Sequence, residues 1–342
     1  MRKYLLPENG NFYKANLHSH SNLSDGKLSP EEMKALYKKH GYSVIAYTDH
    51  DMLIPHHDLT DDDFLALSGF EVEINQDGSP LKKTDKTCHL CFIAKSSDMD
   101  IQPCWHEKYA HIGNAKINKD KVKYDKTQPP YERTYTPECI NDMIKKGREA
   151  GFFVTYNHPT WSFETYNEYM KYEGMNAIEI LNYGCEVIGY NAYVPYVYND
   201  ILNSGKKVFA VAADDNHNKH PEHSPYCDSC GGFVMIKADE LKYEKITDAL
   251  FAGNFYASSG PKIYNLYIEN NEIRITCSDA VMITLNTGRR TSRIVMAPKG
   301  EVINEAKFEF NYEDIYLRIT VKDACGKFAD TNAYFLKDLC NE

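Results

Sequence analysis

Residues 16–26 of this 342-residue chain are Asn-Leu-His-Ser-His-Ser-Asn-Leu-Ser-Asp-Gly. We predict that Asn16–His20 ends a strand. Alternate residues of a strand face the same side, so the imidazoles of His18 and His20 can reach one centre. An isolated His-x-His pair is common in exposed segments. Its meaning therefore depends on what the rest of the chain brings to the same place.

Outward from this segment, strands and helices alternate. Ser29-Pro30-Glu31-Glu32 combines a capping serine, a first-turn proline and two acids, which predicts a helix running to a stop at Gly41. Thr136-Pro137-Glu138 predicts a second helix of the same kind. Further strands are expected at Ser43–Tyr47, Phe64–Leu67, His89–Ala94, Phe152–Tyr156, Ala177–Leu181 and Val208–Ala212. This alternation favours a parallel sheet or a barrel.

Histidines and carboxylates recur where these strands begin or end. They are Asp25, Asp49, His50, Glu71, Glu73, His89, His158, Asp215 and His217. The carboxyl ends of barrel strands meet at one face and build the active site there. Mixed imidazole and carboxylate donors suit Zn, Mn or Fe rather than Ca. The sequence therefore predicts a metal centre at this face.

As an ordered set these motifs resemble the PHP superfamily, named after polymerase and histidinol phosphatase. The resemblance spans residues 16–260. The run Tyr256–Pro261, followed by predicted strands, is similar to the two-domain branch of metal-dependent phosphoesterases in that superfamily. The resemblance implies a distorted (β/α)7 barrel of PHP type with a C-terminal all-β, sandwich-like domain.

The resemblance also implies three divalent ions per chain, of Zn, Mn or Fe. The implied ligands are His18, His20, Glu71 and Asp215 for the first ion, Glu71, His89 and His158 for the second, and Asp25, His50 and His217 for the third. A carboxylate with two oxygens is suited to bridge two cations, which is the role given to Glu71. Asp214 and Glu73 are competing ligands.

The implied reaction is hydrolysis of a phosphoester, either a small phosphomonoester or a nucleotide-type substrate, by a metal-bound hydroxide. Leaving-group protonation needs a donor, and the sequence leaves His217, His50 and Asp49 open. Arg133, just before the helix start at Thr136, is the candidate phosphate clamp because guanidinium pairs bidentately with phosphate.

Two other functions stay open. The first is hydrolysis of a carbon–nitrogen bond by an amidohydrolase-like barrel, which also begins with His-x-His. The second is a non-catalytic scaffold that binds metal or a partner. The bridging Glu71, Ser24-Asp25-Gly26 and Thr48-Asp49-His50 favour the phosphoesterase. The substrate itself is not determined by these motifs.

We expect residues 1–260 to form the barrel, with an insertion at about 96–133, and residues 261–342 to form a small β-sandwich. The insertion is polar and lysine-rich, and we interpret it as a solvated surface excursion. In the second part, short β-prone runs follow one another without a long helix. The spacing of His220, His223, Cys227 and Cys230 would also allow a structural zinc, against the alternative of an ordinary loop.

Composition limits the partners. The chain has 49 acidic and 39 basic residues and a net charge of −10. This surface disfavours general nucleic-acid binding, so a small phosphorylated substrate is expected. No apolar run is long enough to span a membrane, and the ten scattered cysteines indicate free thiols in a reducing compartment, so we expect a cytoplasmic protein. Oligomers remain possible.

Overall fold

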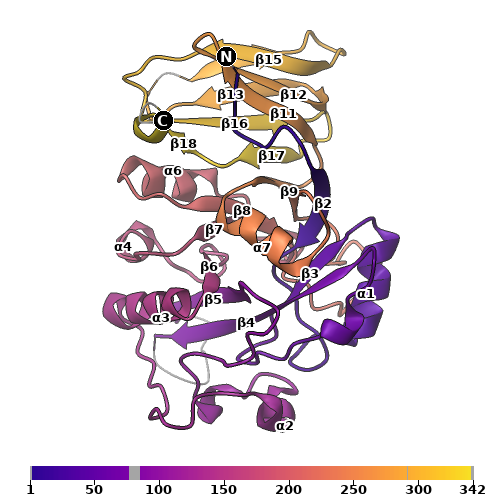
Figure 1. The fold of residues 1–342 in the computed structure, drawn as a ribbon, viewed down its shortest axis with the longest axis vertical. Coiled ribbons are helices and arrows are strands. Elements are labelled where there is room, and N and C mark those ends of the chain that lie inside the picture. The colour runs from indigo at the N-terminus through magenta and orange to yellow at the C-terminus, as the bar shows by residue number, and fades with distance from the viewer. Residues whose placement is uncertain (1, 77–84, 291, 340–342) are drawn as a thin grey trace.

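The computed structural model describes residues 2–76, 85–290 and 292–339. The fold is mixed α/β, with one large sheet, a smaller sheet and a β-rich C-terminal region at one end of the molecule (Figure 1). Along its path the large sheet has the order β14 (Arg293–Met296), β13 (Met282–Asn286), β16 (Tyr316–Lys322), β17 (Phe328–Thr331), β10 (Phe255–Ser258), β9 (Phe233–Ala238), β2 (Asn11–Asn16), β3 (Val44–Tyr47), β4 (Leu65–Asn75), β5 (Thr87–Ala94), β6 (Phe152–Tyr156), β7 (Ala177–Asn182) and β8 (Phe209–Ala213).

The remaining elements are short or lie against the sheets. The small sheet has the order β1 (Lys3–Tyr4), β11 (Ile263–Glu269), β12 (Glu272–Ala280) and β15 (Ile303–Glu309), and β18 (Tyr334–Phe335) pairs with β16. The helices are α1 (Pro30–Lys39), α2 (Ala115–Asn118), α3 (Pro137–Glu149), α4 (Tyr166–Tyr169), α5 (Tyr183–Val187), α6 (Pro195–Asn203), α7 (Tyr243–Phe251) and α8 (Leu336–Leu339), with 3-10 turns η1 (His57–Leu59), η2 (Glu107–Tyr109) and η3 (Lys119–Lys121).

The sheet is mixed rather than all parallel. β2, β3 and β4 run parallel, and so do β6, β7 and β8, but β5 is antiparallel to both of its neighbours. The N-terminal end of β5 therefore lies beside the C-terminal ends of β4 and β6. This explains why His89 begins its strand whereas most other metal-ligand candidates follow theirs.

The strand ladder forms an open path, and barrel closure stays a prediction. β8 is the terminal strand of that path. The segments that follow β8 and β2 nevertheless meet, because the Asp215 N–H donates to the His18 carbonyl at 2.9 Å and the His20 N–H donates to the Asn216 carbonyl at 3.0 Å. The two ends of the N-terminal strand series thus come together at the face that carries the histidines.

The predicted helix starts are confirmed by their caps. At α1 the Ser29 hydroxyl accepts from the Glu32 N–H and the Glu32 carboxylate accepts from the Ser29 N–H, with Pro30 in the first turn. At α3 the Thr136 hydroxyl accepts from the Cys139 N–H.

The C-terminal β region packs as two layers around a common apolar core. Its centre includes Ile273 and Ile275 of β12 together with Leu285 of β13 and Ile319 of β16. Hydrogen bonds cross the expected division at residue 260, where β10 pairs with β17, and β1 joins the small sheet. The division into 1–260 and 261–342 stays a prediction.

Segment 96–133 is largely solvent-exposed, and a few of its residues anchor it to the loop that follows β3. Trp105, Ala110, Ala115 and Val122 form a small core with Met52. A cavity of about 870 Å³ lies within this segment. The apolar residues that anchor the segment are widely spaced among its lysines and show no helical or strand periodicity.

The nine described cysteines are free thiols, as expected, and Cys340 lies outside the described residues. Within the described ranges, no helix combines the length and the apolar character needed to span a bilayer.

Gly147 fixes how closely α3 packs on the sheet. A Cβ atom at this position would lie 2.2 Å from Cε1 of Phe92, whose ring is stacked on Phe70 and meets the edge of Phe152. We therefore expect Gly147→Ala to lower the free energy of unfolding by about 1 to 3 kcal/mol through overpacking, although alanine is the better helix former. Urea unfolding would measure it, with the exposed Lys145→Ala on the same helix as control. A stabilised Gly147→Ala protein would contradict this packing.

Candidate metal centre

His18 and His20 lie directly after β2, which ends at Asn16 and is shorter there than predicted. Their segment remains extended because it is held between two neighbours. The Ser19 N–H donates to the Thr48 hydroxyl at 2.9 Å, and a parallel bridge joins Ser19 to Asn216. Both imidazoles face the same side, and their Nε2 atoms are 3.1 Å apart.

The Glu71 carboxylate occupies the middle of the cluster. It projects from the buried strand β4, and its side chain is 1% exposed. Nitrogen atoms of five imidazoles lie 3.1–3.3 Å from its oxygens, those of His18, His20, His50, His89 and His158. Burial opposes its ionisation, but the surrounding imidazoles, His18 first, outweigh burial and hold the pKa of Glu71 well below its usual range.

The four donors expected for the first ion have the spacing of a coordination shell. The Nε2 atoms of His18 and His20 lie 3.1–3.3 Å from each other, from oxygens of Glu71 and from Oδ1 of Asp215. Ligand atoms about 2.0–2.1 Å from a tetrahedral ion are about 3.3 Å apart. The spacing of the two Nε2 atoms from each other and from these oxygens is therefore compatible with a shared metal ion.

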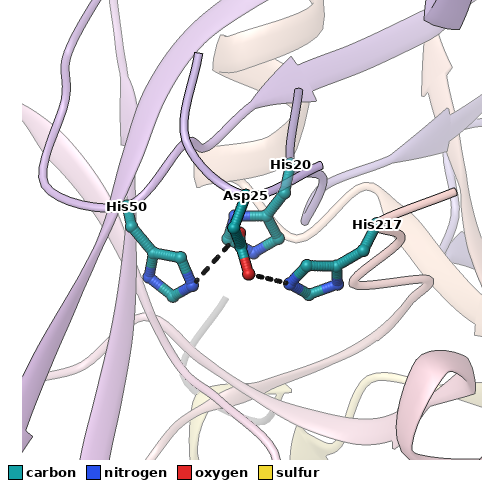
Figure 2. Close-up of side chains that lie close together, drawn as sticks. All are labelled: His20, Asp25, His50 and His217. Carbon is teal, nitrogen blue, oxygen red and sulfur yellow. Dashed lines mark ion pairs between the residues drawn. The ribbon is translucent and has the colours of Figure 1, made fainter. Parts of the chain in front are cut away.

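A second group of donors lies at the more open side of the cluster. His20, Asp25, His50 and His217 each offer an atom within 4.8 Å of the others. Figure 2 shows the Asp25 carboxylate between the rings of His50 and His217, at 3.9 Å from His50 Nε2 and 3.2 Å from His217 Nε2. These are the residues expected for the third ion, with His20 in addition.

Three further donor groups overlap around His18 and Glu71. They are Glu71, His89 and His158; His18, His158 and Asp215; and His18, Glu71 and Cys91. Each of the predicted ligands thus belongs to at least one group. The sequence analysis did not single out Cys91. Burial raises the pKa of the Cys91 thiol to about 11, so it is protonated at neutral pH and is a weak candidate ligand.

Several donor atoms in the cluster lack partners. Within the described part of the chain, His20 Nδ1, Asp25 Oδ1 and His89 Nε2 are buried and make no hydrogen bond. Buried polar atoms are normally satisfied, so such orphans need an explanation. An ion at each group would supply the missing partner, and the donor chemistry suits Zn, Mn or Fe.

The pKa values of two neighbouring imidazoles in the cluster, those of His20 and His50, are shifted in opposite directions. Burial disfavours a charged His20, yet its hydrogen bonds to Asp215 and Glu71 outweigh burial and raise the pKa of His20 to about 10. Burial and the neighbouring His20 lower the pKa of His50 to about 4. The carboxylates thus favour positive charge in the cluster, but the imidazoles lie too close together for all of them to be protonated. Divalent ions would provide the positive charge that is missing.

Glu179 of β7 is a site residue that the sequence analysis missed. Its Oε1 lies 2.7 Å from His18 Nδ1, and its Oε2 accepts from the His158 N–H and from Asn182 Nδ2, each at 2.9 Å. With Nδ1 bonded to Glu179, His18 presents Nε2 to the cluster. The available indication was a carboxylate inside the apolar run Ile178-Glu179-Ile180.

The Asp49 carboxylate is hydrogen-bonded to a neighbouring loop, whereas the sequence analysis considered it as a proton donor to the leaving group. Its Oδ1 accepts from the Ser21 N–H at 2.8 Å and from the Ser24 N–H and hydroxyl, while its Oδ2 accepts from the Ser21 hydroxyl at 2.6 Å. The loop thus folded carries Asp25. At the end of this loop, a side chain on Gly26 would collide with the His20 carbonyl oxygen, 2.1 Å from its Cβ.

The contacts of Asp214 and Glu73 distinguish these two competing ligands from the residues of the cluster. Both oxygens of Asp214 accept backbone N–H groups of residues 230–232, and the Tyr37 hydroxyl donates to Oδ2, so Asp214 faces away from the cluster. Glu73 lies at its margin, 3.9 Å from His89 Nε2 and 3.4 Å from His111 Nε2. Among the described residues, no metal-binding group contains His220, His223, Cys227 or Cys230.

Arg133 is sealed inside the protein. Its side chain is 2% exposed, its Nη2 pairs with Asp51, and its Nη1 donates at 3.1 Å to both Asp51 and the Glu73 carbonyl. The ring of Tyr109 covers the guanidinium at 4.2 Å. Phosphate binding by Arg133 stays a prediction that this arrangement does not favour, because Nη1 and Nη2 already have partners and the side chain is buried, although its Nε makes no hydrogen bond.

The turn after β6 presents an aromatic side chain to the centre. Trp161 meets the rings of His89 and His158 edge-on, at centroid distances of 5.2 and 5.1 Å. The turn is anchored at Glu164, whose carboxylate accepts from the hydroxyls of Tyr135, Tyr156 and Tyr172. Burial raises the pKa of Glu164 to about 7, although these hydrogen bonds favour its ionised form.

Comparison of the chain with protein-family models and with curated proteins finds no match. A solved two-domain protein from Bacteroides vulgatus ATCC 8482, described as containing a predicted PHP-like metal-dependent phosphoesterase, is 14% identical over 97% of this chain and 98% of its own, with a TM-score of 0.45. A candidate metal-dependent phosphoesterase from Bifidobacterium adolescentis ATCC 15703 is 15% identical over 64% of this chain and 91% of its own, with a TM-score of 0.35.

An amidohydrolase from Chromobacterium violaceum, solved with sulfate and no metal, is 16% identical over 62% of this chain and 93% of its own, with a TM-score of 0.37. PHP-like phosphoesterases are thus among the solved structures that this chain resembles, as its motifs led us to expect. The low identities and TM-scores leave its function to rest on its own side chains.

Replacing Arg133 tests whether it is structural. We expect Arg133→Met to lower the free energy of unfolding by about 3 to 5 kcal/mol, because it leaves the Asp51 carboxylate buried without its partner. The double variant Asp51→Asn, Arg133→Met should recover part of this loss, since asparagine tolerates the left-handed backbone at position 51 (φ 54°). Denaturant unfolding measures both. A fully stable Arg133→Met protein would return Arg133 to the list of phosphate ligands.

Glu164 should make stability depend on pH. The folded protein keeps a proton on this carboxyl up to about pH 7, whereas the unfolded chain loses it near the ordinary value of 4.5. Its contribution is therefore present at low pH and lost as the pH rises from about 4.5 to 7, by up to about 3 kcal/mol. Glu164→Gln should flatten this part of the stability curve, measured by urea unfolding at several pH values, whereas the exposed Glu149→Gln should not.

Proposed function

We propose that this chain is a metal-dependent phosphoester hydrolase. The observation that carries the proposal is the shell of imidazole nitrogens and carboxylate oxygens around Glu71, spaced at 3.1–3.3 Å. Folding stability does not explain so many buried histidines and carboxylates, because apolar residues packed in their place would stabilise the fold at least as well. It is explained by the ions that it would hold.

We infer three sites with shared members. His18, His20 and Asp215 would hold the first ion with Glu71; Glu71, His89 and His158 the second; and Asp25, His50 and His217 the third. Divalent ions held this way supply positive charge for the phosphoryl oxygens and lower the pKa of bound water, so that a nucleophile exists at neutral pH. A multinuclear site of this kind is suited to phosphoester hydrolysis.

The chain's own residues fix the orientation of the rings. Glu179 holds His18 Nδ1, and the Asp215 carbonyl lies 3.0 Å from His217 Nδ1, so both rings present Nε2 to the cluster. Of the three candidates for leaving-group protonation, His217 is the most exposed at 22%, compared with 8% for His50. Asp49 is occupied by its loop. Exposure favours His217 among the three, but it could protonate a leaving group only while its Nε2 does not ligate the third ion.

Glu71→Gln tests the centre with little change of shape. We expect this variant to lose at least two of three bound ions and at least about 100-fold in phosphate release, because a neutral amide cannot compensate two cations. Elemental analysis of protein purified without a His tag or chelator gives the metal content. Phosphate release from a panel of phosphomonoesters, bisphosphates and cyclic phosphates gives the activity, and His20→Ala should behave similarly.

His40→Ala is the matched control, because this exposed histidine pairs with Glu222 away from the cluster. Wild-type protein that holds no metal after reconstitution, or a Glu71→Gln protein with full metal content and activity, would overturn the proposal. Hydrolysis of amides or lactams without phosphate release would support the carbon–nitrogen hydrolase instead.

A further inference from the structure

The cluster opens to solvent at one edge. Side chains of Asp25 and His217 are 23% and 22% exposed, whereas those of Glu71 and His20 are 1% and 0% exposed. Glu71 is enclosed by imidazoles, so a molecule arriving from solvent meets the Asp25–His217 edge first. A group that selects the substrate should therefore lie at this edge.

Lys219 lies at the Asp25–His217 edge. Its ammonium is 3.6 Å from Asp25 Oδ2, the same oxygen that His217 Nε2 approaches, and its side chain is 51% exposed. Among ion pairs of the described residues, this is the one that joins a lysine or arginine to Asp25, Glu71 or Asp215. Arg133, the cation expected from sequence, is enclosed with Asp51.

The backbone that carries Lys219 is firmly held. The Asp228 carboxylate accepts from the N–H groups of His217 and Asn218, at 2.7 and 3.1 Å, and Asn218 Nδ2 donates to the Ser229 hydroxyl at 2.6 Å. Asn218 has a left-handed backbone with φ 54°, which asparagine tolerates better than most residues. These contacts set the position from which the lysine side chain extends.

The far end of the same loop is also anchored. Asp214 accepts the N–H groups of Cys230, Gly231 and Gly232 at 2.7–2.9 Å. Residues 217–232 are thus fixed at both ends, next to His217.

We propose that Lys219 binds the phosphate group of the substrate at the Asp25–His217 edge, an inference that rests on the proposed hydrolase function. An exposed ion pair at 3.6 Å contributes little to folding, so stability does not account for the placement of Lys219. Ammonium is a compact cation with three donors and binds phosphate as a point charge. On a chain of net charge −10, such a cation offsets the repulsion of an anion.

The chemistry favours a phosphomonoester. Its terminal phosphate has three non-bridging oxygens, so one can face Lys219 while the others face the donor cluster. A phosphodiester has only two. We therefore expect Lys219 to matter most for a dianionic terminal phosphate.

Lys219→Ala and Lys219→Arg test this role. With metal-loaded protein, the alanine variant should raise KM for p-nitrophenyl phosphate and Kd for inorganic phosphate about tenfold, the loss expected for one charged contact, with kcat within about twofold. The arginine variant should stay within about threefold of wild type. Calorimetric titration with inorganic phosphate gives Kd independently of turnover.

Lys242→Ala is the control, because this exposed lysine pairs with Glu240 beside α7. Unchanged KM and Kd in Lys219→Ala at full metal content would overturn the inference. Loss of metal from that variant would overturn the inference too, since Lys219 would then act by holding the metal ligand Asp25 in place rather than by binding phosphate. Metal-loaded wild type that neither binds nor releases phosphate would overturn the hydrolase function itself. If wild type releases phosphate and Lys219→Ala has the same KM and Kd, only the inference about Lys219 is overturned.

Discussion

A single buried carboxylate, that of Glu71, organises the functional face. A charge at this depth is tolerated only with compensation, and five imidazoles surround it at 3.1–3.3 Å. These imidazoles come from segments that follow β2, β3 and β6 and from β5 itself. The ends of β2, β3 and β6 and the start of β5 must therefore all be correctly placed for the charge of Glu71 to be compensated. The antiparallel course of β5 is part of this solution, because it brings the start of a strand to a face otherwise formed by strand ends.

Around this centre, other carboxylates act as supports. Asp49 folds the serine loop that carries Asp25, Asp214 holds the loop that follows His217, and Glu179 fixes both the His18 ring and the backbone of His158. The last contact matters because His158 has φ 22° and Asp215 has φ 52°, conformations that non-glycine residues rarely adopt. Hydrogen bonds to these supports stabilise the strained backbone, and the strained backbone in turn aims the donor side chains.

The sequence predicted the parts of this arrangement that depend on local pattern. Helix starts at Ser29 and Thr136 follow from capping chemistry, and strands such as Phe152–Tyr156 follow from short apolar runs. Each of the nine metal ligands that the family resemblance implies belongs to a donor group in the structure, whereas Asp49 and Glu73 belong to none among the described residues.

What the sequence did not predict depends on pairing across long separations. The direction of β5, the open path of the sheet and the pairing of β1 with β11 leave no periodic trace in the chain. Arg133 and Lys219 show the same limit at the level of one side chain. Local context favoured Arg133, yet Asp51, distant in sequence, encloses it, whereas Lys219 gains its place only because Asp25 folds next to it.

The meeting of the segments after β2 and β8 has a consequence for how the protein acquires its function. Hydrogen bonds between His18 and Asp215 and between His20 and Asn216 join parts of the chain that are synthesised far apart in time. During translation, the first histidines emerge long before the residues that complete their surroundings. Contacts of such high sequence separation form late and slow the folding of the regions that depend on them. We therefore expect the centre to assemble at a late stage, and an ion bound there would stabilise the contact between the two ends of the N-terminal strand series rather than any single loop.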